Sequence, residues 1–266
     1  MFVDADGEPS LLPGPGEQCI ALTETFSLLQ KRKGHRYSVD DMLVAHLATT
    51  WSAPTPGRVL DLGCGLGSVL LIVAWAFPET RLVGLEVLDE HLAYARRNVR
   101  LNGCRGRVRV VPGDLRDRAL VAGLGPFDFV TGSPPYFVPG SGTPCADPAR
   151  TAAHFELRGG VEAYARAAAT ALAPEGLFFC CAPANPPERA RAALEGAGLS
   201  PLFLQPVVPR AGRPPFLVLL VARPRRAGSP PPVEAGPLVL RDAQGRRSLA
   251  QIAIREWTGI PCPDGR

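Results

Sequence analysis

Short apolar runs alternate with longer, helix-length runs through the middle of the chain. Runs of strand length, rich in leucine and valine, lie at residues 58–63, 81–86, 107–113, 127–133 and 177–182. The segments between them include an uncharged one at 68–77 and an amphipathic one at 89–103, in which Leu92, Ala95 and Val99 share a face. Strands that alternate with helices in this way predict a parallel sheet with helices on both sides.

Two final apolar runs, at 199–209 and 216–224, extend the predicted sheet. The few residues between them cannot hold a crossover helix, and parallel strands need a connection of about a dozen residues or more. We therefore predict an α/β fold with a Rossmann-like, seven-stranded, mostly parallel sheet that ends in an antiparallel strand pair. An alanine-rich helix is expected over 159–176 and a further helix over 186–198.

The same pattern divides the chain into three parts. We expect a disordered N-terminus over residues 1–20 and a main domain over 21–223 that begins with a helical cap. Residues 224–266 are expected to form a proline-rich linker and a short extension that packs on the domain. Hydrophobic residues make up 46% of the chain and charged residues 20%, which is typical of a globular protein.

The N-terminal segment has neither the basic start nor the apolar core of a signal peptide, and no apolar run is long enough to cross a bilayer. We expect a cytoplasmic protein that does not contact a membrane, and we expect it to be a monomer. The seven cysteines form no C-x-x-C pair and the four histidines are scattered. This spacing indicates neither a disulfide framework nor a metal site.

A glycine-rich turn follows the first strand. Gly63, Gly65 and Gly67 give the pattern G-x-G-x-G, and Asp61 stands two residues before the first glycine. Glycines at such a turn let the backbone approach a ligand closely. A dinucleotide fingerprint would have its third glycine where this chain has Ser68, so the turn favours another kind of ligand.

Two further carboxylates stand at the ends of later strands. Glu86 ends the second strand and Asp114 follows the third. Ligands bind at the carboxyl edge of such sheets, and a carboxylate after the second strand can accept from ribose hydroxyls. Each acid also has a structural interpretation, because Asp61 could orient a turn, Glu86 could begin a helix and Asp114 could cap one. Their common edge favours a ligand that contains adenosine.

The turn and its preceding acid resemble motif I of the S-adenosylmethionine-dependent methyltransferases. The resemblance implies the class I methyltransferase fold and S-adenosyl-L-methionine as cofactor. It also implies a set of cofactor contacts, which are Asp61, Gly63, Gly65, Gly67, Glu86 and Asp114.

The tetrapeptide Ser133-Pro134-Pro135-Tyr136 ends the fourth strand. Two prolines can serve simply as a rigid turn. A similar tetrapeptide, with Asn or Asp before Pro-Pro and an aromatic residue after it, is carried at this place by class I methyltransferases that modify exocyclic or amide nitrogens. The resemblance implies that Ser133, beside the cofactor, and a backbone carbonyl accept the two N–H groups of the target nitrogen, and that Tyr136 stacks on the base.

Over about residues 22–259 the chain resembles the bacterial tRNA adenine-N6 methyltransferases, which modify the adenine next to the anticodon of a valine tRNA. The segments that carry this resemblance are 31–48, 133–157, 206–224 and 238–259. It implies an RNA substrate, with an adenine of tRNA as the acceptor. It also implies that Tyr37 and Asp40 belong to a segment that closes over the cofactor, although Asp40 could instead cap a helix.

The chain departs from that family at two places. It has Ser133 where the family usually has Asn, and His154-Phe155-Glu156 where the family has a basic residue and His before Glu. Serine can accept a hydrogen bond, but its oxygen lies one bond nearer the backbone than an Asn amide oxygen. With serine at this position, either the base moves or the activity falls. Ser-Pro-Pro-Tyr is also similar to the motif of the DNA cytosine-N4 methyltransferases, which leaves the identity of the target base open.

The net charge of +4 permits a nucleic-acid substrate without requiring one. Candidate nucleic-acid contacts are the grouped basic residues Lys31, Arg32, Lys33, Arg210 and Arg213, for which an ordinary solvated surface is the alternative. We predict N6-methylation of an adenine in tRNA. The alternatives are methylation of an rRNA adenine, a DNA base or a protein glutamine, and a catalytically weak RNA-binding module that retains the cofactor pocket.

Overall fold

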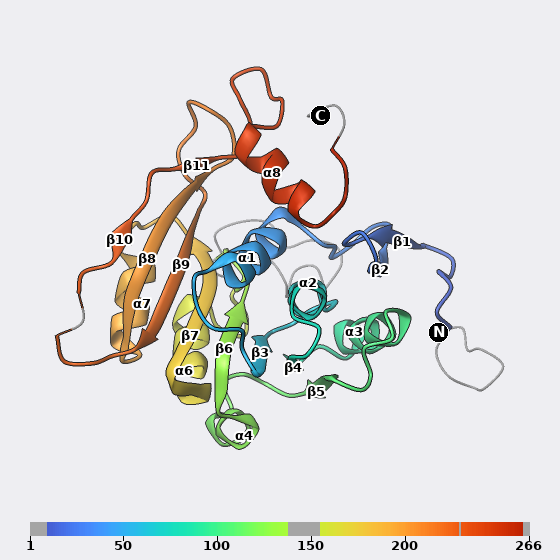
Figure 1. Cartoon of the computed structure of the whole chain (residues 1–266), viewed down its shortest axis with the longest axis horizontal. Coiled ribbons are helices and arrows are strands. Elements are labelled where there is room, and N and C mark those ends of the chain that lie inside the picture. The colour runs from blue at the N-terminus through green and yellow to red at the C-terminus, as the bar shows by residue number, and fades with distance from the viewer. Residues whose placement is uncertain (1–9, 138–154, 229, 263–266) are drawn as a thin grey trace.

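The computed structural model describes residues 10–137, 155–228 and 230–262, and its centre is one twisted sheet (Figure 1). The main strands in chain order are β3 (Arg58–Leu62), β4 (Arg81–Glu86), β5 (Val108–Pro112), β6 (Phe127–Gly132), β7 (Leu172–Pro183), β8 (Leu199–Val208) and β9 (Leu217–Pro224). Each coincides with one of the apolar runs in the sequence. These runs form strands because burial on both faces of a parallel sheet requires nearly continuous apolar residues.

The strand order in space is β8-β9-β7-β6-β3-β4-β5. The neighbouring strands β5, β4, β3, β6 and β7 pair in parallel in that order. Strand β9 runs antiparallel to both β7 and β8. The predicted mostly parallel sheet with an antiparallel final pair is therefore confirmed. The proline-rich segment after β9 adds two short strands, β10 (Val233–Glu234) and β11 (Leu238–Val239), which pair with β8 in parallel.

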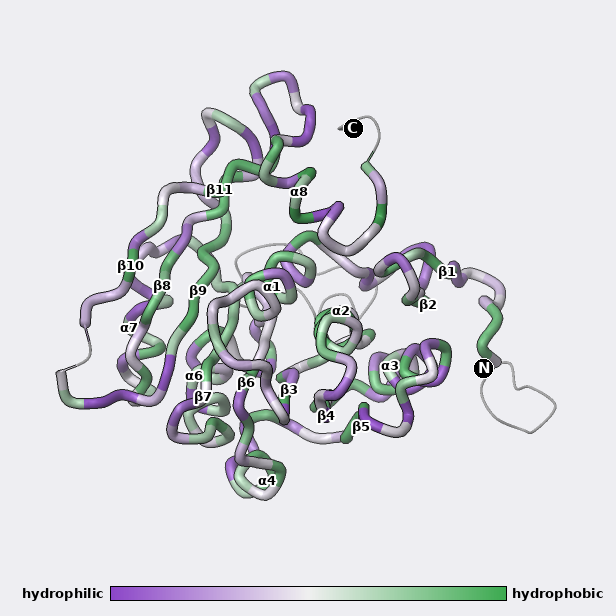
Figure 2. The backbone as a smooth tube through the Cα atoms, viewed as in Figure 1, coloured by the Kyte–Doolittle hydropathy of each residue, from purple (hydrophilic) through white to green (hydrophobic). Residues whose placement is uncertain are grey.

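Helices cover both faces of the sheet. On one face lie α1 (Val39–Thr50), α2 (Ser68–Ala76) and α3 (Asp89–Leu101). On the other lie α4 (Arg118–Leu124), α6 (Val161–Ala171) and α7 (Arg189–Gly196). Figure 2 shows hydrophobic residues along the central strands and along α2, a helix without charged residues. In the described part of the chain, no helix combines the length and the apolar character needed to cross a membrane.

The alanine-rich helix α6 ends at Ala171, five residues before the predicted end at 176. Leu172 already has an extended backbone, with φ −70° and ψ 140°, and begins β7. Pro174 explains the early end because the residue before a proline is driven out of the helical region.

An antiparallel hairpin precedes the cap helix α1. It consists of β1 (Glu17–Ala21) and β2 (Ser27–Lys31) and is anchored on α3 by two asparagines. Asn98 accepts from the backbone N–H of Leu29 at 2.7 Å, and Asn102 accepts from that of Ser27 at 2.8 Å. Ordered structure thus begins before residue 21, within the segment expected to be disordered, while residues 1–9 lie outside the described part.

The C-terminal extension ends in α8 (Leu249–Trp257), which packs on the cap side of the sheet. The ring of Trp257 lies 5.2 Å from that of His46 on α1 and 5.5 Å from that of Trp75 on α2, both edge-on. Large aromatic side chains contribute most of the burial in such contacts. The end of the extension therefore packs on α1 and α2.

Candidate active site

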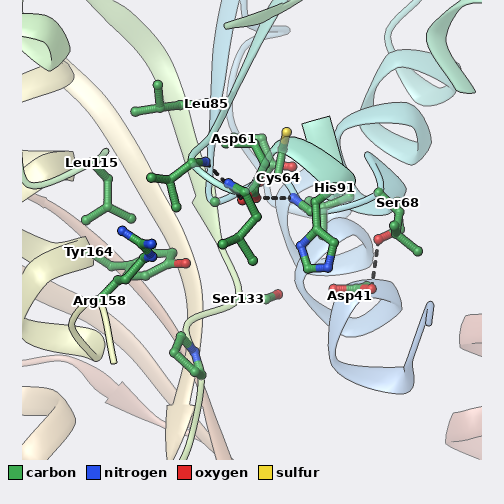
Figure 3. A pocket seen from close by; sticks show the side chains of 18 of the residues that line it. Asp41, Asp61, Cys64, Ser68, Leu85, His91, Leu115, Ser133, Arg158 and Tyr164 are labelled. Carbon is green, nitrogen blue, oxygen red and sulfur yellow. Dashed lines mark hydrogen bonds between the residues drawn. The ribbon is translucent and has the colours of Figure 1, made fainter. Parts of the chain in front are cut away.

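One cavity opens at the carboxyl ends of β3, β4, β5 and β6, and it brings together most of the residues predicted to hold the cofactor or the acceptor group (Figure 3). The predicted residues that line it are Asp40, Asp61, Gly63, Gly65, Glu86, Asp114, Ser133 and Pro135. Parallel strands that end together at one edge explain why segments far apart in the sequence meet here.

The glycine-rich turn forms one wall of the cavity. Gly63, Gly65 and Gly67 all have left-handed backbones, with φ of 59°, 55° and 85°. A Cβ on Gly63 would lie 2.3 Å from the hydroxyl of Tyr164 on α6. This turn therefore requires glycine both for its conformation and for the close approach of Tyr164. Gly67 lies behind the cavity, where it caps the N-terminus of α2.

Glu86 is held in place by backbone N–H groups. One carboxylate oxygen accepts from Gly65 at 2.9 Å, and the other accepts from Val87 at 2.9 Å and Leu88 at 2.8 Å. A carboxylate has about four lone-pair sites, so roughly one remains for a ligand. Glu86 thus ties β4 to the glycine turn and can still accept from a hydroxyl in the cavity.

Asp61 presents an unused acceptor in the site. The Thr131 hydroxyl donates to Oδ1 at 2.7 Å, whereas Oδ2 has no hydrogen-bond partner among the described residues. Burial, assisted by the charge of Glu86, raises the pKa of Asp61 to about 7. A buried acceptor without a partner is costly, so a hydrogen-bond donor or a positive charge supplied by a ligand would stabilise it.

Asp41, which the sequence did not single out, lies across the cavity from this acid (Figure 3). It accepts from the Ser68 hydroxyl at 2.7 Å. Burial and the neighbouring Asp40 raise its pKa to about 8. The carboxyl groups that line the cavity are those of Asp40, Asp41, Asp61, Glu86 and Asp114. This excess of acidic groups suits a ligand that carries positive charge.

Asp114, just after β5, forms hydrogen bonds with Arg116. Two guanidinium nitrogens of Arg116 donate to the carboxylate at 3.0 and 2.7 Å, and the backbone N–H of Arg116 donates at 2.9 Å. These contacts hold the pKa of Asp114 below its usual range. The carboxylate therefore stays charged at the cavity rim.

The Ser-Pro-Pro-Tyr tetrapeptide enters the same cavity from β6. Ser133 and Pro135 line it, and Pro134 is buried behind them. Tyr136 instead turns toward α1 and the core: its hydroxyl donates to Asp40 Oδ2 at 2.6 Å and lies 3.2 Å from Cys181 Sγ on β7. The Tyr136 hydroxyl is therefore engaged inside the protein in this conformation.

Tyr37 and Asp40, the two predicted cofactor contacts near the start of α1, differ in position. Only Asp40 lines the cavity. Tyr37 packs against the core instead, and burial raises its pKa above the usual range. The cavity wall at this place is formed by His35, whose ring contacts that of His91 with 4.7 Å between the centroids and a tilt of 30° between the planes.

Tyr164 and Arg158 complete the wall on the opposite side (Figure 3). The sequence did not predict either residue as part of the site, because both lie far along the chain from the glycine turn and its carboxylates.

The predicted nucleic-acid contacts lie on two surfaces. Arg32 and Lys33 are exposed, and Lys31 pairs with Glu90. Arg210 and Arg213 are exposed in the loop between β8 and β9, where the Arg210 guanidinium donates to the carbonyl of Ala243.

The later segment that departs from the tRNA methyltransferase pattern is only partly described. His154 lies outside the described residues. Glu156 is held by Arg189 through two contacts of 2.8 Å each, so its role here is an ion pair with the start of α7. No group of three or more His, Cys, Asp or Glu residues in the described segments could hold a metal ion.

Comparison with protein families gives a match to the methyltransferase domain over residues 59–139. That span runs from β3, through the glycine turn, to the residues just after the tetrapeptide. The chain carries an S-adenosylmethionine-dependent methyltransferase domain. S-adenosyl-L-methionine is the cofactor of this domain, and the predicted class I methyltransferase fold is confirmed by solved methyltransferase structures.

Two curated relatives of the methyltransferase domain carry different names. The tRNA1(Val) (adenine(37)-N6)-methyltransferase of Porphyromonas gingivalis is 29% identical over 161 residues, which cover 59% of this chain and 62% of that protein. The release factor glutamine methyltransferase of Chlorobaculum tepidum is 34% identical over 86 residues, or 32% of this chain and 29% of that protein. The chain thus spans less than two thirds of the length of these relatives.

Solved structures share the fold of the methyltransferase domain. A predicted O-methyltransferase of Agrobacterium tumefaciens superposes with a TM-score of 0.62 at 21% identity, over 84% of this chain and 98% of that one. The methyltransferase SMU.776, solved in complex with S-adenosylhomocysteine, gives a TM-score of 0.58 at 14% identity, over 80% of this chain and 57% of that one.

Proposed function

We propose that this chain transfers a methyl group from S-adenosylmethionine to an exocyclic amino nitrogen, namely N6 of an adenine in tRNA. The observation that carries the proposal is the position of Ser133 and Pro135. They line the same cavity as Glu86 and the unpartnered oxygen of Asp61. A nitrogen acceptor held by the tetrapeptide would therefore lie beside the cofactor.

The residues of the cavity fit the cofactor. S-adenosylmethionine supplies an electrophilic methyl group on a positively charged sulfur when bound. The glycine turn leaves room for close backbone contact, and Glu86 retains an acceptor site for a ribose hydroxyl. A sulfonium or ammonium group beside Asp61 and Asp41 would favour the charged forms of both acids and so lower their raised pKa values.

The tetrapeptide would position the acceptor nitrogen. An amino group on a base ring has a delocalised lone pair, so it must become pyramidal before it can attack. Acceptors for both of its N–H groups, the Ser133 hydroxyl and a backbone carbonyl of the prolines, favour that geometry. This role needs no strong general base, and we assign none.

The RNA would be held in part by arginines near the mouth of the cavity. Leu217 at the start of β9 pairs with Pro183 at the end of β7, so the loop that bears Arg210 and Arg213 lies at the carboxyl edge of the sheet. Arg226 lies beyond Pro224, at the opposite end of β9. Arg213→Ala should lower the slope of log tRNA affinity against log salt concentration by about one, the value for one lost phosphate contact. The control Arg226→Ala should leave this slope unchanged.

The decisive experiment is mass spectrometry of nucleosides from unmodified tRNA that has been incubated with the protein and isotope-labelled S-adenosylmethionine. We expect labelled N6-methyladenosine, and we expect Ser133→Ala to lower its rate of formation. If calorimetry shows bound cofactor but no labelled adenosine forms in any tRNA, the tRNA assignment is wrong.

Glutamine in a protein is the second candidate acceptor, and the relative from Chlorobaculum tepidum is the observation that favours it. A glutamine amide also has two N–H groups on a delocalised nitrogen, so the same tetrapeptide can hold it. The same labelled donor with rRNA, DNA and release factors as substrates separates these acceptors. If RNA binds, no substrate is methylated, and Ser133→Asn creates turnover, the chain is a weak RNA-binding module.

A further inference from the structure

Cys181 lies directly behind the acceptor side of the site. Gly132 of β6 pairs with Cys180 of β7, so the next residues, Ser133 and Cys181, are neighbours at the carboxyl edge. Cys181 Sγ lies 3.7 Å from the Ser133 hydroxyl oxygen and 3.2 Å from the Tyr136 hydroxyl oxygen. The thiol is fully buried, and burial raises its pKa well above the usual range, so it keeps its hydrogen.

The hydrogens of this cluster can be assigned by counting donors. Tyr136 has a single hydroxyl hydrogen, which is directed at the Asp40 carboxylate at 2.6 Å because a carboxylate can only accept. The Tyr136 oxygen must then accept at its 3.2 Å contact with Cys181, and the thiol has no second hydrogen. The remaining contact, at 3.7 Å, has the geometry of a thiol that donates to the Ser133 oxygen. Because the single thiol hydrogen is given to the nearer Tyr136 oxygen, the sulfur can only accept at this contact, and the Ser133 hydroxyl becomes the donor.

We propose that Cys181 is a positioning residue that turns the Ser133 hydroxyl into a hydrogen-bond acceptor for the substrate nitrogen. With its hydrogen on the sulfur, Ser133 presents lone pairs to the cavity, as the amide oxygen of an asparagine would. Without the sulfur, the hydroxyl hydrogen can point at the N–H groups of the substrate and oppose their approach. This inference rests on the proposed N-methyltransferase function and identifies what lets serine serve at this position.

The test is a set of variants assayed at saturating cofactor. Cys181→Ala should lower kcat roughly tenfold, the effect of losing one hydrogen bond, with the KM for S-adenosylmethionine unchanged. In a Ser133→Asn background the same substitution should have no effect, because an amide oxygen has no hydrogen to misdirect. Cys181→Ser, which keeps an acceptor, should recover part of the rate.

Cys180→Ala is the matched control. Cys180 is equally buried on the same strand but faces the opposite core, among α6 and α7. It should lose a similar amount of packing, visible as a lower unfolding temperature, with kcat unchanged. If Cys180→Ala slows the reaction as much as Cys181→Ala, or if the Cys181→Ala loss persists with Asn at 133, Cys181 acts only through packing and the proposal is wrong.

A second readout does not depend on the reaction. The infrared S–H stretch of Cys181, isolated by subtracting the spectrum of Cys181→Ala, reports the hydrogen bonds of that thiol. Ser133→Ala should shift this band, and Tyr136→Phe should shift it further, since the thiol donates to Tyr136. A band that does not respond to Ser133→Ala overturns the proposal. This measurement requires no substrate, so its failure can be distinguished from failure of the proposed function.

Discussion

The two halves of the candidate active site are built in different ways. On the cofactor side the backbone fixes the geometry: Gly63 and Gly65 have left-handed conformations, and three backbone N–H groups orient Glu86. On the acceptor side, side chains from three elements hold one another: Asp40 of α1, Tyr136 after β6 and Cys181 of β7. The contacts that orient Glu86 and the glycine turn come from the strands and the turns after them, whereas the contacts on the acceptor side depend on α1 being in place.

The acceptor side is therefore coupled to the cap through Asp40. This side chain lines the cofactor cavity and also receives the hydroxyl hydrogens of Tyr136 and Ser38. Release of Tyr136 to stack on a base, the role that the family resemblance implies, requires that its hydrogen bond with Asp40 be broken. The difference between the halves predicts that backbone changes abolish cofactor binding, while side-chain changes on the acceptor side leave it intact.

The largest expected effect is that of Gly63→Ala. The new Cβ would meet the Tyr164 hydroxyl at 2.3 Å, and the left-handed conformation adds about 1–2 kcal/mol of strain. We expect affinity for S-adenosylhomocysteine in calorimetry to fall at least about a hundredfold, since Tyr164 is pushed into the cavity. Gly103→Ala is the control, because Gly103 has φ 66° with open space around it and suffers the strain alone.

Tyr164→Phe in the Gly63→Ala background sharpens this test. Removing the hydroxyl leaves the nearest ring carbon 3.2 Å from the new Cβ, so part of the affinity should return. If Gly63→Ala binds the cofactor as well as Gly103→Ala does, the backbone does not define the cofactor side and the comparison between the halves fails.

The fold was largely predictable from the sequence because its signals are local. Each strand of the parallel core is a short apolar run, and the glycine turn follows its strand directly. The carboxylates on that edge needed only their position in the strand order. The first strand of the N-terminal hairpin was missed because β1 has no fully buried residue, and the hairpin is held on α3 by polar contacts of Asn98 and Asn102 with β2.

The acceptor side was predictable in composition but not in arrangement. The resemblance identified Ser133 and Tyr136, but no local pattern shows that Tyr136 would bond to Asp40, 96 residues away, or that Cys181 would lie behind both. Cys181 lies in the predicted strand 177–182, where the simplest role for a cysteine is that of a core residue. Its neighbour Cys180 does have that role, so residue type alone could not distinguish the two.

Glu86→Gln should have the next largest effect on the cofactor side. An amide cannot accept on both sides, so either the Gly65 contact or the Val87 and Leu88 contacts would be lost. The neutral amide would also accept more weakly than the carboxylate from a ribose hydroxyl. A hydrogen bond to a charged group contributes about 1.5–3 kcal/mol, so its loss corresponds to about a tenfold to hundredfold lower cofactor affinity. Glu90→Gln on the exposed face of α3 is the control, and an equal loss there would show a general charge effect instead.

A pH effect follows from Asp61. Its pKa of about 7 exceeds the unfolded value of about 3.9, so the folded protein holds this proton and loses stability as pH rises from about 4 to about 7. A cationic ligand favours the charged carboxylate, so cofactor affinity should rise over the same range and by up to about tenfold between pH 6 and 8. Titration calorimetry at both pH values measures this gain.

Asp61→Asn should remove the part of the rise that belongs to Asp61 and leave the part that belongs to Asp41, whose pKa is about 8 and whose contribution therefore continues above pH 8. An affinity that rises equally in Asp61→Asn and in the unaltered protein would assign the effect to another group. The cofactor side would then be sensitive to pH for a reason other than its unpartnered carboxylate.

The smallest effect, and the sharpest test of the separation between the halves, is expected from Tyr136→Phe. The substitution removes the hydrogen bond to Asp40 and keeps the ring, so the free energy of unfolding should fall by about 1–2 kcal/mol and the unfolding temperature by about 2–4 °C. Cofactor affinity should stay within about twofold, because Glu86, the glycine turn and Asp61 are untouched. Thermal unfolding and calorimetry on the same preparation measure both quantities. A large drop in cofactor affinity would mean that the bond between Tyr136 and Asp40 holds the cap over both halves, and that the acceptor side helps to build the cofactor site.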